Sequence, residues 1–375
     1  MKNLTDVMDM TIAVRGKESV IVFAANGDEG CPYDGCYDYH QIFAVRPDQD
    51  PVRIRSLPAA MAGVSPSADA LPIALPDGLH VLTQGHAAAA ATGPYDAAPD
   101  TFFLVRGEAV HHKWEKWFSG AYASAPSGDH ALVLGVGIES AAFRTGNPGP
   151  SSVRMIVVSS SSLKSEVLVK GAENGPSYAS PAVAADGTNA AVAFLQKTSD
   201  AKATVLLAGW VNPITGKLDG ALQQIAKGDL GAPAIALEGT RVHLVWAERA
   251  GSAPYRLKQS TWDRAAPKAD AAVALATKTD SSFAPSLSFA AGHALLAWTS
   301  GSQNTAGQAH FGASPIAPTN DMLERAASAA TPLSAATTNG RDPEMAIEDG
   351  KGLIAWTEVD KAGRRIAVAP LTCTP

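Results

Sequence analysis

The chain is poor in the residues that mark several large classes of protein. Its 375 residues include 3 cysteines, 18% charged residues and 6% aromatic residues. No run of about eighteen apolar residues is present, so we expect no membrane-spanning helix. Lysine and arginine are dispersed and the formal net charge is −6. This balance argues against nucleic acid as a partner, because a nucleic-acid-binding face must neutralise phosphates.

Short catalytic motifs are missing as well. The chain has no Gly-x-Ser-x-Gly nucleophile elbow, no His-Glu-x-x-His zinc motif and no P-loop. Nucleophilic catalysis therefore has no support, and no cofactor is predicted. Glycoside hydrolysis stays open, because it needs two apposed carboxylates that distant loops can supply without a local motif.

What the chain does have is an internal repeat. Four times a proline is followed thirteen residues later by an aromatic residue, at Pro181/Phe194, Pro233/Trp246, Pro285/Trp298 and Pro343/Trp356. A glycine-centred turn between two apolar stretches lies inside each copy, which is typical of a strand, a tight turn and a second strand. The prolines are 52, 52 and 58 residues apart, a period that suits a four-stranded propeller blade.

Earlier copies can be placed at Met10, Pro72 and Tyr122. We therefore predict an all-β chain that forms one domain over residues 1–375, a seven-bladed β-propeller with four antiparallel strands in each blade. The blades start near residues 10, 72, 122, 181, 233, 285 and 343. The last blade runs out of chain after its third strand, so residues 1–8 are expected to supply its fourth strand and close the ring.

Alternation and composition also locate the third strands and one short helix. The helix is expected at 320–330, with an outer strand as the alternative. The third strands are expected at 41–45, 101–105, 153–158, 204–210, 255–260, 308–313 and 365–369.

The blade pattern APAIALEGTRVHLVWAE and its copy RDPEMAIEDGKGLIAWTE carry a resemblance to known proteins. The chain resembles the sialidase-like and related non-enzymatic β-propellers of exported bacterial proteins, at the level of the fold. The aspartate boxes, the Arg-Ile-Pro motif and the arginine triad of sialidases have no counterpart here. The resemblance therefore implies a shape and leaves glycosidase chemistry in doubt.

Two cysteines bear on the cellular location of the protein. Cys31 and Cys36 flank a Pro-Tyr-Asp-Gly turn, a spacing that suits a disulfide across a hairpin tip; two reduced thiols are the alternative. Because disulfides persist in oxidising compartments, the bond would make the protein extracellular or periplasmic, although this sequence begins without a signal peptide. A reduced pair would keep a cytoplasmic location open.

Long loops follow the second strands of blades one to three, whereas the later ones are short. Long loops on a rigid scaffold are common sites of recognition, so we predict a binding ridge over these blades; drift in loop length is the alternative. The ridge residues are Tyr33, Tyr37, His86, Tyr95, Asp96, Phe143 and Arg144.

Acidic residues crowd the first of these loops. Asp28, Glu29, Asp34 and Asp38 could hold calcium, and solvated loop acids are the alternative. The segment HHKWEKWF at 111–118 could bind a metal or a sugar but fits the outer strand of the second blade. Glu248 and Glu358 each stand two residues after a repeat tryptophan, a shared position that indicates a structural role for both.

These observations favour a rigid, non-enzymatic scaffold that recognises a protein or a surface polymer at the cell envelope. The alternative is a carbohydrate-active enzyme or lectin with its site over the central channel. An enzyme should bring acids together near that channel.

Overall fold

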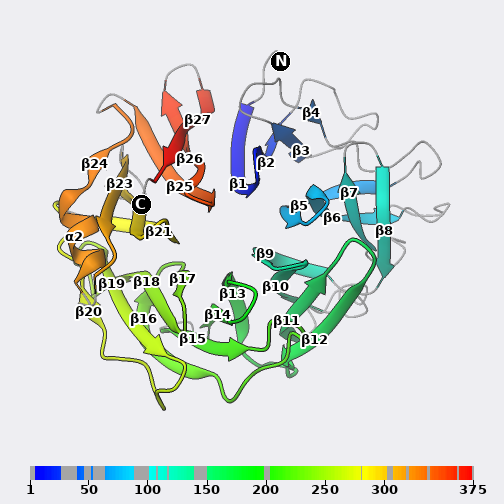
Figure 1. Ribbon diagram of the computed structural model, residues 1–375, viewed down its shortest axis with the longest axis horizontal. Coiled ribbons are helices and arrows are strands. Elements are labelled where there is room, and N and C mark those ends of the chain that lie inside the picture. The colour runs from blue at the N-terminus through cyan, green and yellow to red at the C-terminus, as the bar shows by residue number, and fades with distance from the viewer. Residues whose placement is uncertain are drawn as a thin grey trace.

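A computed structural model describes residues 5–26, 40–45, 52–53, 64–87, 101–106, 109–115, 118–138, 150–197, 203–279, 281–301, 307–317, 321–335, 338–360 and 363–373. These parts of the chain form antiparallel sheets and one short helix, α2 (Met322–Ala329). The sheets stand side by side around a common centre, each with its first strand innermost (Figure 1). None of the described helices is long and apolar enough to cross a membrane.

The first three sheets have four strands each, in chain order. The first comprises β1 (Thr5–Arg15), β2 (Glu18–Asn26), β3 (His40–Val45) and β4 (Val52–Arg53). The second comprises β5 (Val64–Leu75), β6 (Gly78–Ala87), β7 (Thr101–Arg106) and β8 (Ala109–Glu115). The third comprises β9 (Phe118–Ser127), β10 (His130–Ile138), β11 (Ser151–Val158) and β12 (Leu163–Val169).

An eight-stranded sheet follows, made of two four-stranded halves that β16 and β18 join. Its first half is β13 (Ser177–Ala185), β14 (Ala190–Lys197), β15 (Thr204–Val211) and β16 (Gln223–Leu230). Its second half is β17 (Ala234–Glu238), β18 (Arg241–Arg249), β19 (Arg256–Asp263) and β20 (Val273–Ala274).

Two sheets complete the described chain. One contains β21 (Ser282–Ala290), β22 (His293–Ser300), β23 (Gln308–Pro315) and β24 (Thr331–Pro332). The last contains β25 (Asn339–Glu348), β26 (Lys351–Asp360) and β27 (Gly363–Thr372). The strands expected from alternation are all present with boundaries within three residues, and α2 lies inside the segment where the sequence favours a helix. The segment 111–118 supplies most of β8, as the structural interpretation expected, and the start of β9.

The first two strands of each unit form a hairpin whose turn carries a glycine in the left-handed region. Gly350 shows why no other residue fits there: its φ is 73°, and an added Cβ would lie 2.7 Å from the carbonyl oxygen of Cys373. A side chain at this position would strain the backbone and collide with it. The turn glycines that the repeat revealed are therefore fixed by conformation.

Buried clusters fill the space between neighbouring sheets. The repeat aromatics belong to these clusters, since Phe194 and Trp246 are 0% exposed, Trp298 is 1% and Trp356 is 7%. Their predicted role as packing residues between sheets is confirmed. One such cluster lies between each neighbouring pair of sheets, and one of them joins Met10, Ile21 and Phe23 of the first sheet to Ala355 of the last.

The N-terminal strand does not complete the last sheet. Thr5 pairs with Asn26 and Met8 with Ala24, both within the first sheet. The last sheet has three strands among the described residues, so the expectation that residues 5–8 supply its fourth strand is wrong. The β1 strand instead packs on β25, β26 and β27. Residues 1–4 lie outside the described residues.

Candidate functional site

The inner strands are interrupted by a bulge at the repeat proline. The register shifts between Ala179 and Ala182 in β13, and at the equivalent places in β21 and β25. The residue before each proline adopts a left-handed backbone, with φ of 50° at Ser180, 47° at Ala284 and 51° at Asp342. Because a bulge leaves a residue unpaired and re-aims its side chain, it gives an inner strand a place to present chemistry.

The three bulges differ in what they present. Around the proline the first copy has Ser180 and Ala182, the second has Ala284 and Ser286, and the third has Asp342 and Glu344. Only the last of these three carries ionisable groups, one on each side of its proline. Both side chains are solvent-exposed on the innermost strand of the last sheet. We name Asp342 and Glu344 the axial acids.

Hydroxyl groups of the neighbouring sheet hold this bulge in place. The backbone N–H of Asp342 donates to Oγ1 of Thr299 at 2.8 Å, and the N–H of Met345 donates to Oγ of Ser286 at 3.2 Å. Ser286 also hydrogen-bonds the carboxyl group of Glu344. Thr299 is 0% exposed, so this support is rigid. The axial acids are thus positioned by residues from β21 and β22.

The two axial acids differ in their environment. Protein surrounds Glu344 on the inner side of the ring, and this desolvation, together with the negative charge of Asp342, raises the pKa of Glu344 to about 8, although Ser286 opposes the shift. The residue as a whole remains solvent-exposed. At neutral pH Glu344 is therefore protonated beside the charged Asp342, and a neutral carboxyl next to a carboxylate is the arrangement that acid–base catalysis uses.

Glu248 and Glu358 have a different role. Glu358 accepts the indole N–H of Trp356 at 3.0 Å and two hydrogen bonds from Arg365 at 2.9 and 2.7 Å. Glu248 accepts the indole N–H of Trp246 at 3.2 Å and a hydrogen bond from Lys258 at 2.8 Å. Each carboxylate therefore joins a core tryptophan to a third-strand cation. This pair confirms the shared structural role that their repeat position indicated.

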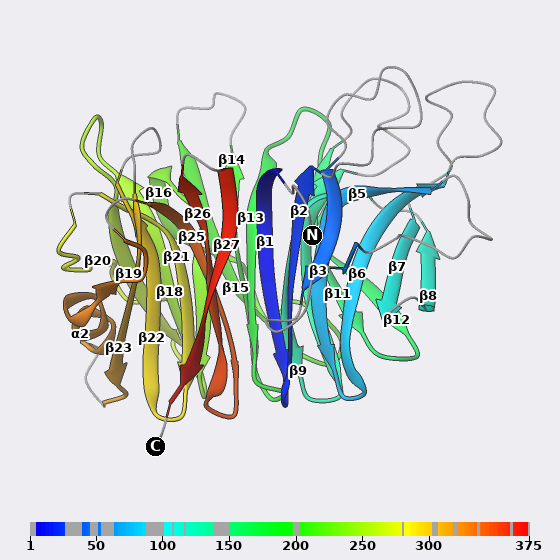
Figure 2. The same cartoon turned by 90° about the horizontal axis from the view of Figure 1, so that it is seen from above.

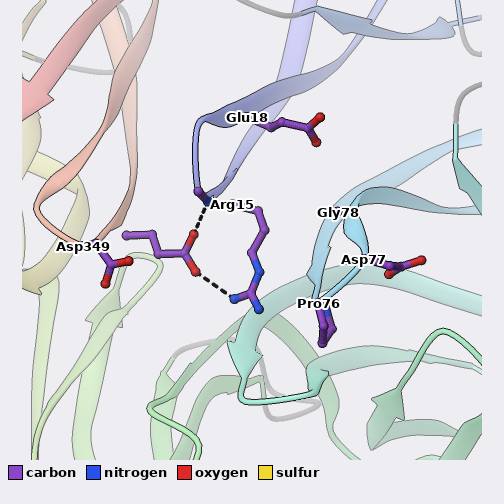
Figure 3. A pocket seen from close by; sticks show the side chains of 8 residues that line it. Arg15, Glu18, Pro76, Asp77, Gly78 and Asp349 are labelled. Carbon is purple, nitrogen blue, oxygen red and sulfur yellow. Dashed lines mark hydrogen bonds and ion pairs between the residues drawn. The ribbon is translucent and has the colours of Figure 1, made fainter.

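A pocket of about 370 Å³ lies at the turns between the first and second strands of the first, second and last sheets. Arg15 donates to Glu348 across it at 2.7 Å, and Glu18, Asp77 and Asp349 line it (Figure 3). Asp349 follows the end of β25, so the pocket is separated from the axial acids along that strand. The described residues contain no group of three or more side chains suited to a metal ion.

Most of the site residues predicted from sequence lie outside the described residues. These are Asp28, Glu29, Cys31, Tyr33, Asp34, Cys36, Tyr37, Asp38, Tyr95, Asp96, Phe143 and Arg144. His86 lies in β6 opposite Ser65, and its side chain is not among those described. The calcium site, the disulfide and the ridge therefore stay predictions. Cys373, left over in the sequence, is a free and partly buried thiol.

Sequence reasoning missed the axial acids, although a signal was present. The repeat was read for what its copies share, namely proline, glycine and tryptophan. The paired acids lie where one copy departs from the others, in the residues that flank Pro343. A comparison of the flanking residues across the copies would have found Asp342 and Glu344.

Comparison with known proteins supports the fold. No family model matches the chain, and no curated protein sequence is similar to it. Among solved structures, a puromycin-hydrolysing peptidase of Mycobacterium tuberculosis matches with a TM-score of 0.53 and 12% identity, over 97% of this chain and 51% of that one. A mutant α-L-arabinofuranosidase of Fusarium graminearum matches with a TM-score of 0.50 and 11% identity, over 81% of this chain and 92% of that one. A subtype N10 neuraminidase-like protein of A/little yellow-shouldered bat/Guatemala has a TM-score of 0.49 and 7% identity, over 100% of this chain and 95% of that one.

At such low identity these matches show the fold alone, which is an all-β propeller. The neighbours are mostly propeller enzymes that act on carbohydrates. The non-enzymatic scaffold that the sequence favoured is therefore the wrong main interpretation. The alternative, a carbohydrate-active protein with its site over the central channel, agrees better with the neighbours.

Proposed function

We propose that the protein is a glycoside hydrolase of a surface polymer and that its site is centred on Asp342 and Glu344. The observation that supports this most is the pairing of two carboxyl groups around Pro343 on the innermost strand, one of them with a raised pKa, whereas the matching bulges of β13 and β21 carry no acid. The propeller glycosidases among the structural neighbours are consistent with such a site. The partner is then a carbohydrate substrate.

The chemistry follows from the two protonation states. Glycoside hydrolysis needs a carboxylic acid that protonates the leaving oxygen and a carboxylate that supports the positive charge developing on the sugar. Glu344 holds the proton near neutral pH and is the general acid. Asp342, whose negative charge raises the pKa of Glu344, is the stabilising carboxylate. Protonation of the glycosidic oxygen by Glu344 accompanies cleavage of the bond to the anomeric carbon. Water then adds its hydroxyl to that carbon and its other proton returns to Glu344.

The test is hydrolysis of a panel of aryl glycosides and plant and bacterial polysaccharides by the wild type and by Glu344→Gln. General acid catalysis is worth about 10²–10⁴-fold, so the variant should lose that factor in kcat on substrates with poor leaving groups. Asp342→Asn should lose activity as well, whereas Glu324→Gln, an exposed acid on α2, should keep it. An unchanged rate in Glu344→Gln, or cleavage of peptides in place of glycosides, would contradict the proposal.

We further propose that the ring is a closed propeller of seven blades and that it forms a single domain. Support comes from the contacts between consecutive first strands, from β1 to β25 and back to β1, and from the buried clusters between adjacent sheets. The predicted ridge would guide a polymer toward the axial acids.

The location outside the cytoplasm also stays a proposal. It rests on the predicted Cys31–Cys36 disulfide and fits a substrate at the cell surface. Intact mass measured with and without a reductant decides it, because the bond changes the mass by two hydrogens.

A further inference from the structure

The outer edge of the last sheet differs from the other outer edges. Among the described residues β4, β20 and β24 have two residues each, while β8, β12 and β16 each contain a register shift. Short and irregular edges are the usual protection of a sheet against pairing with another strand. β27 is a strand of ten residues that pairs with β26 in unbroken register, so it is neither short nor irregular, and its edge carries Arg364, Arg365 and Pro370 instead.

The backbone groups that β27 offers can be identified. The N–H of Cys373 donates to the carbonyl oxygen of Gly350 at 2.8 Å, which makes this a hydrogen-bonded pair. Because hydrogen-bonded and non-hydrogen-bonded pairs alternate along an antiparallel ladder, the even residues from Arg364 to Thr372 point their N–H and C=O groups away from β26. Pro370 agrees with this assignment. It is an even residue, so the hydrogen bonds between β26 and β27 do not need the N–H that proline lacks.

Most of the exposed side chains of β27 belong to these even residues. Arg364, Val368, Pro370 and Thr372 are exposed and Ile366 is partly buried; Val368 is one of the few large apolar side chains at the surface, at 37%. The outer side of β27 is thus a regular edge with free polar groups of the backbone and an apolar middle (Figure 2 shows this strand along its length). Among the described residues no further strand pairs with it.

We infer that this edge binds a second copy of the chain, with β27 of the two copies antiparallel about a two-fold axis at Ala367. In this register Ile366 faces Val368 of the other copy, and these two outward pairs exchange both of their hydrogen bonds. Arg364 faces Pro370 and Arg365 faces Ala369, so no arginine faces another arginine. The edge therefore pairs with itself without placing like charges opposite each other and with apolar side chains at its middle, and a proline that cannot donate stands at the ends of the ladder.

Light scattering during size-exclusion chromatography tests the inference on the full chain over a dilution series. The wild type should give twice the monomer mass of 38.6 kDa. Val368→Pro removes an outward N–H, and Val368→Lys places a charge on the edge; both should give the monomer mass. Thr372→Lys, an exposed residue beyond the shared ladder, should leave the dimer intact. A wild type that stays monomeric at every concentration overturns the inference, as does a dimer that persists in a folded Val368→Lys variant.

A cross-link supplies a second measurement if Val368→Pro fails to fold. Ala367 of the two copies would form a non-hydrogen-bonded pair at the axis, with Cα atoms about 4.5 Å apart, a separation that permits a disulfide. Oxidised Ala367→Cys should therefore run as a covalent dimer on a non-reducing gel. Ala369→Cys, which faces Arg365, should not cross-link. Equal cross-linking of both variants, or of neither, contradicts the proposed register.

Discussion

Protonation of a single residue, Glu344, links the axial acids to the stability of the chain. The folded protein holds the proton up to a pKa of about 8, whereas the unfolded chain releases it near 4.5. The folded state therefore binds more protons than the unfolded state between these values, and the free energy of unfolding falls as pH rises through them.

Glu344→Gln should remove this dependence. The variant should match the wild type near pH 4 and exceed it at pH 9 by about 1 kcal/mol, since solvent that reaches the carboxyl group weakens the full effect. Urea unfolding at pH 4, 7 and 9 measures it. If the difference in unfolding free energy between the wild type and the variant is the same at pH 5 and pH 9, Glu344 does not have the raised pKa.

Glu358 provides the contrasting case of an acid with a structural role. Its carboxylate joins the indole of Trp356 to Arg365. Glu358→Gln weakens both contacts, and we expect a loss of about 1–3 kcal/mol in the free energy of unfolding with no change in kcat. Chemical denaturation and glycoside hydrolysis, measured on the same preparation, separate the two effects. A large fall in kcat with unchanged stability would move Glu358 into the catalytic site.

How far single residues could be predicted depended on whether their role repeats. Glu248 and Glu358 were interpreted correctly because two copies share their position after the tryptophan. The pKa of Glu344 was beyond reach, because it depends on Ser286 of another sheet and on the crowding of inner strands around the centre. Neither of these is local in the sequence.

At the scale of elements, the strands were predictable because their signals are local. Alternating apolar residues, turn glycines such as Gly239 and the anchor prolines mark each hairpin within a few residues. The pairing partner of the N-terminal strand was not predicted, because the apolar pattern of residues 1–8 suits either β2 or the last sheet. Thr5 pairs with Asn26, a neighbour across a single turn, and this local hairpin is favoured over a distant sheet by the lower entropy of closing a short loop.

The bulge in β25 is the element that should control the site. Thr299→Val removes the hydroxyl that accepts the N–H of Asp342 and leaves that N–H without this partner in a partly buried place. We expect kcat to fall about tenfold with little change in KM, since a small displacement of positioned groups is costly in rate. Kinetics on the best glycoside substrate measures this.

A matched control is Thr261→Val. Thr261 is also buried and donates to Asp270, far from the bulge in the chain, so it should cost stability without lowering kcat. Equal effects of both variants on kcat would show that loss of stability, and not the position of the axial acids, is responsible.

At the scale of the whole molecule, the first and last sheets meet without a shared strand among the described residues. Three kinds of contact join them: the ion pair of Arg15 and Glu348, the hydrogen bond from the backbone N–H of Gly16 to Glu348, and the buried cluster around Phe23 and Ala355. The ion pair is partly exposed, with 29% and 25% of the two side chains accessible, and such pairs contribute about 1 kcal/mol or less. The apolar cluster should therefore provide most of the stability of this junction.

Phe23→Ala should cost about 3–5 kcal/mol of unfolding free energy, the usual range for a buried phenylalanine, whereas Glu348→Gln should cost about 1 kcal/mol or less. Hydrogen exchange adds the spatial test: in Phe23→Ala the amides of β1 and β26 should lose protection before those of β14 and β18, because a ring opens first at its weakest junction. If protection is lost evenly around the ring, the first and last sheets are held as firmly as the others, and a further strand must join them.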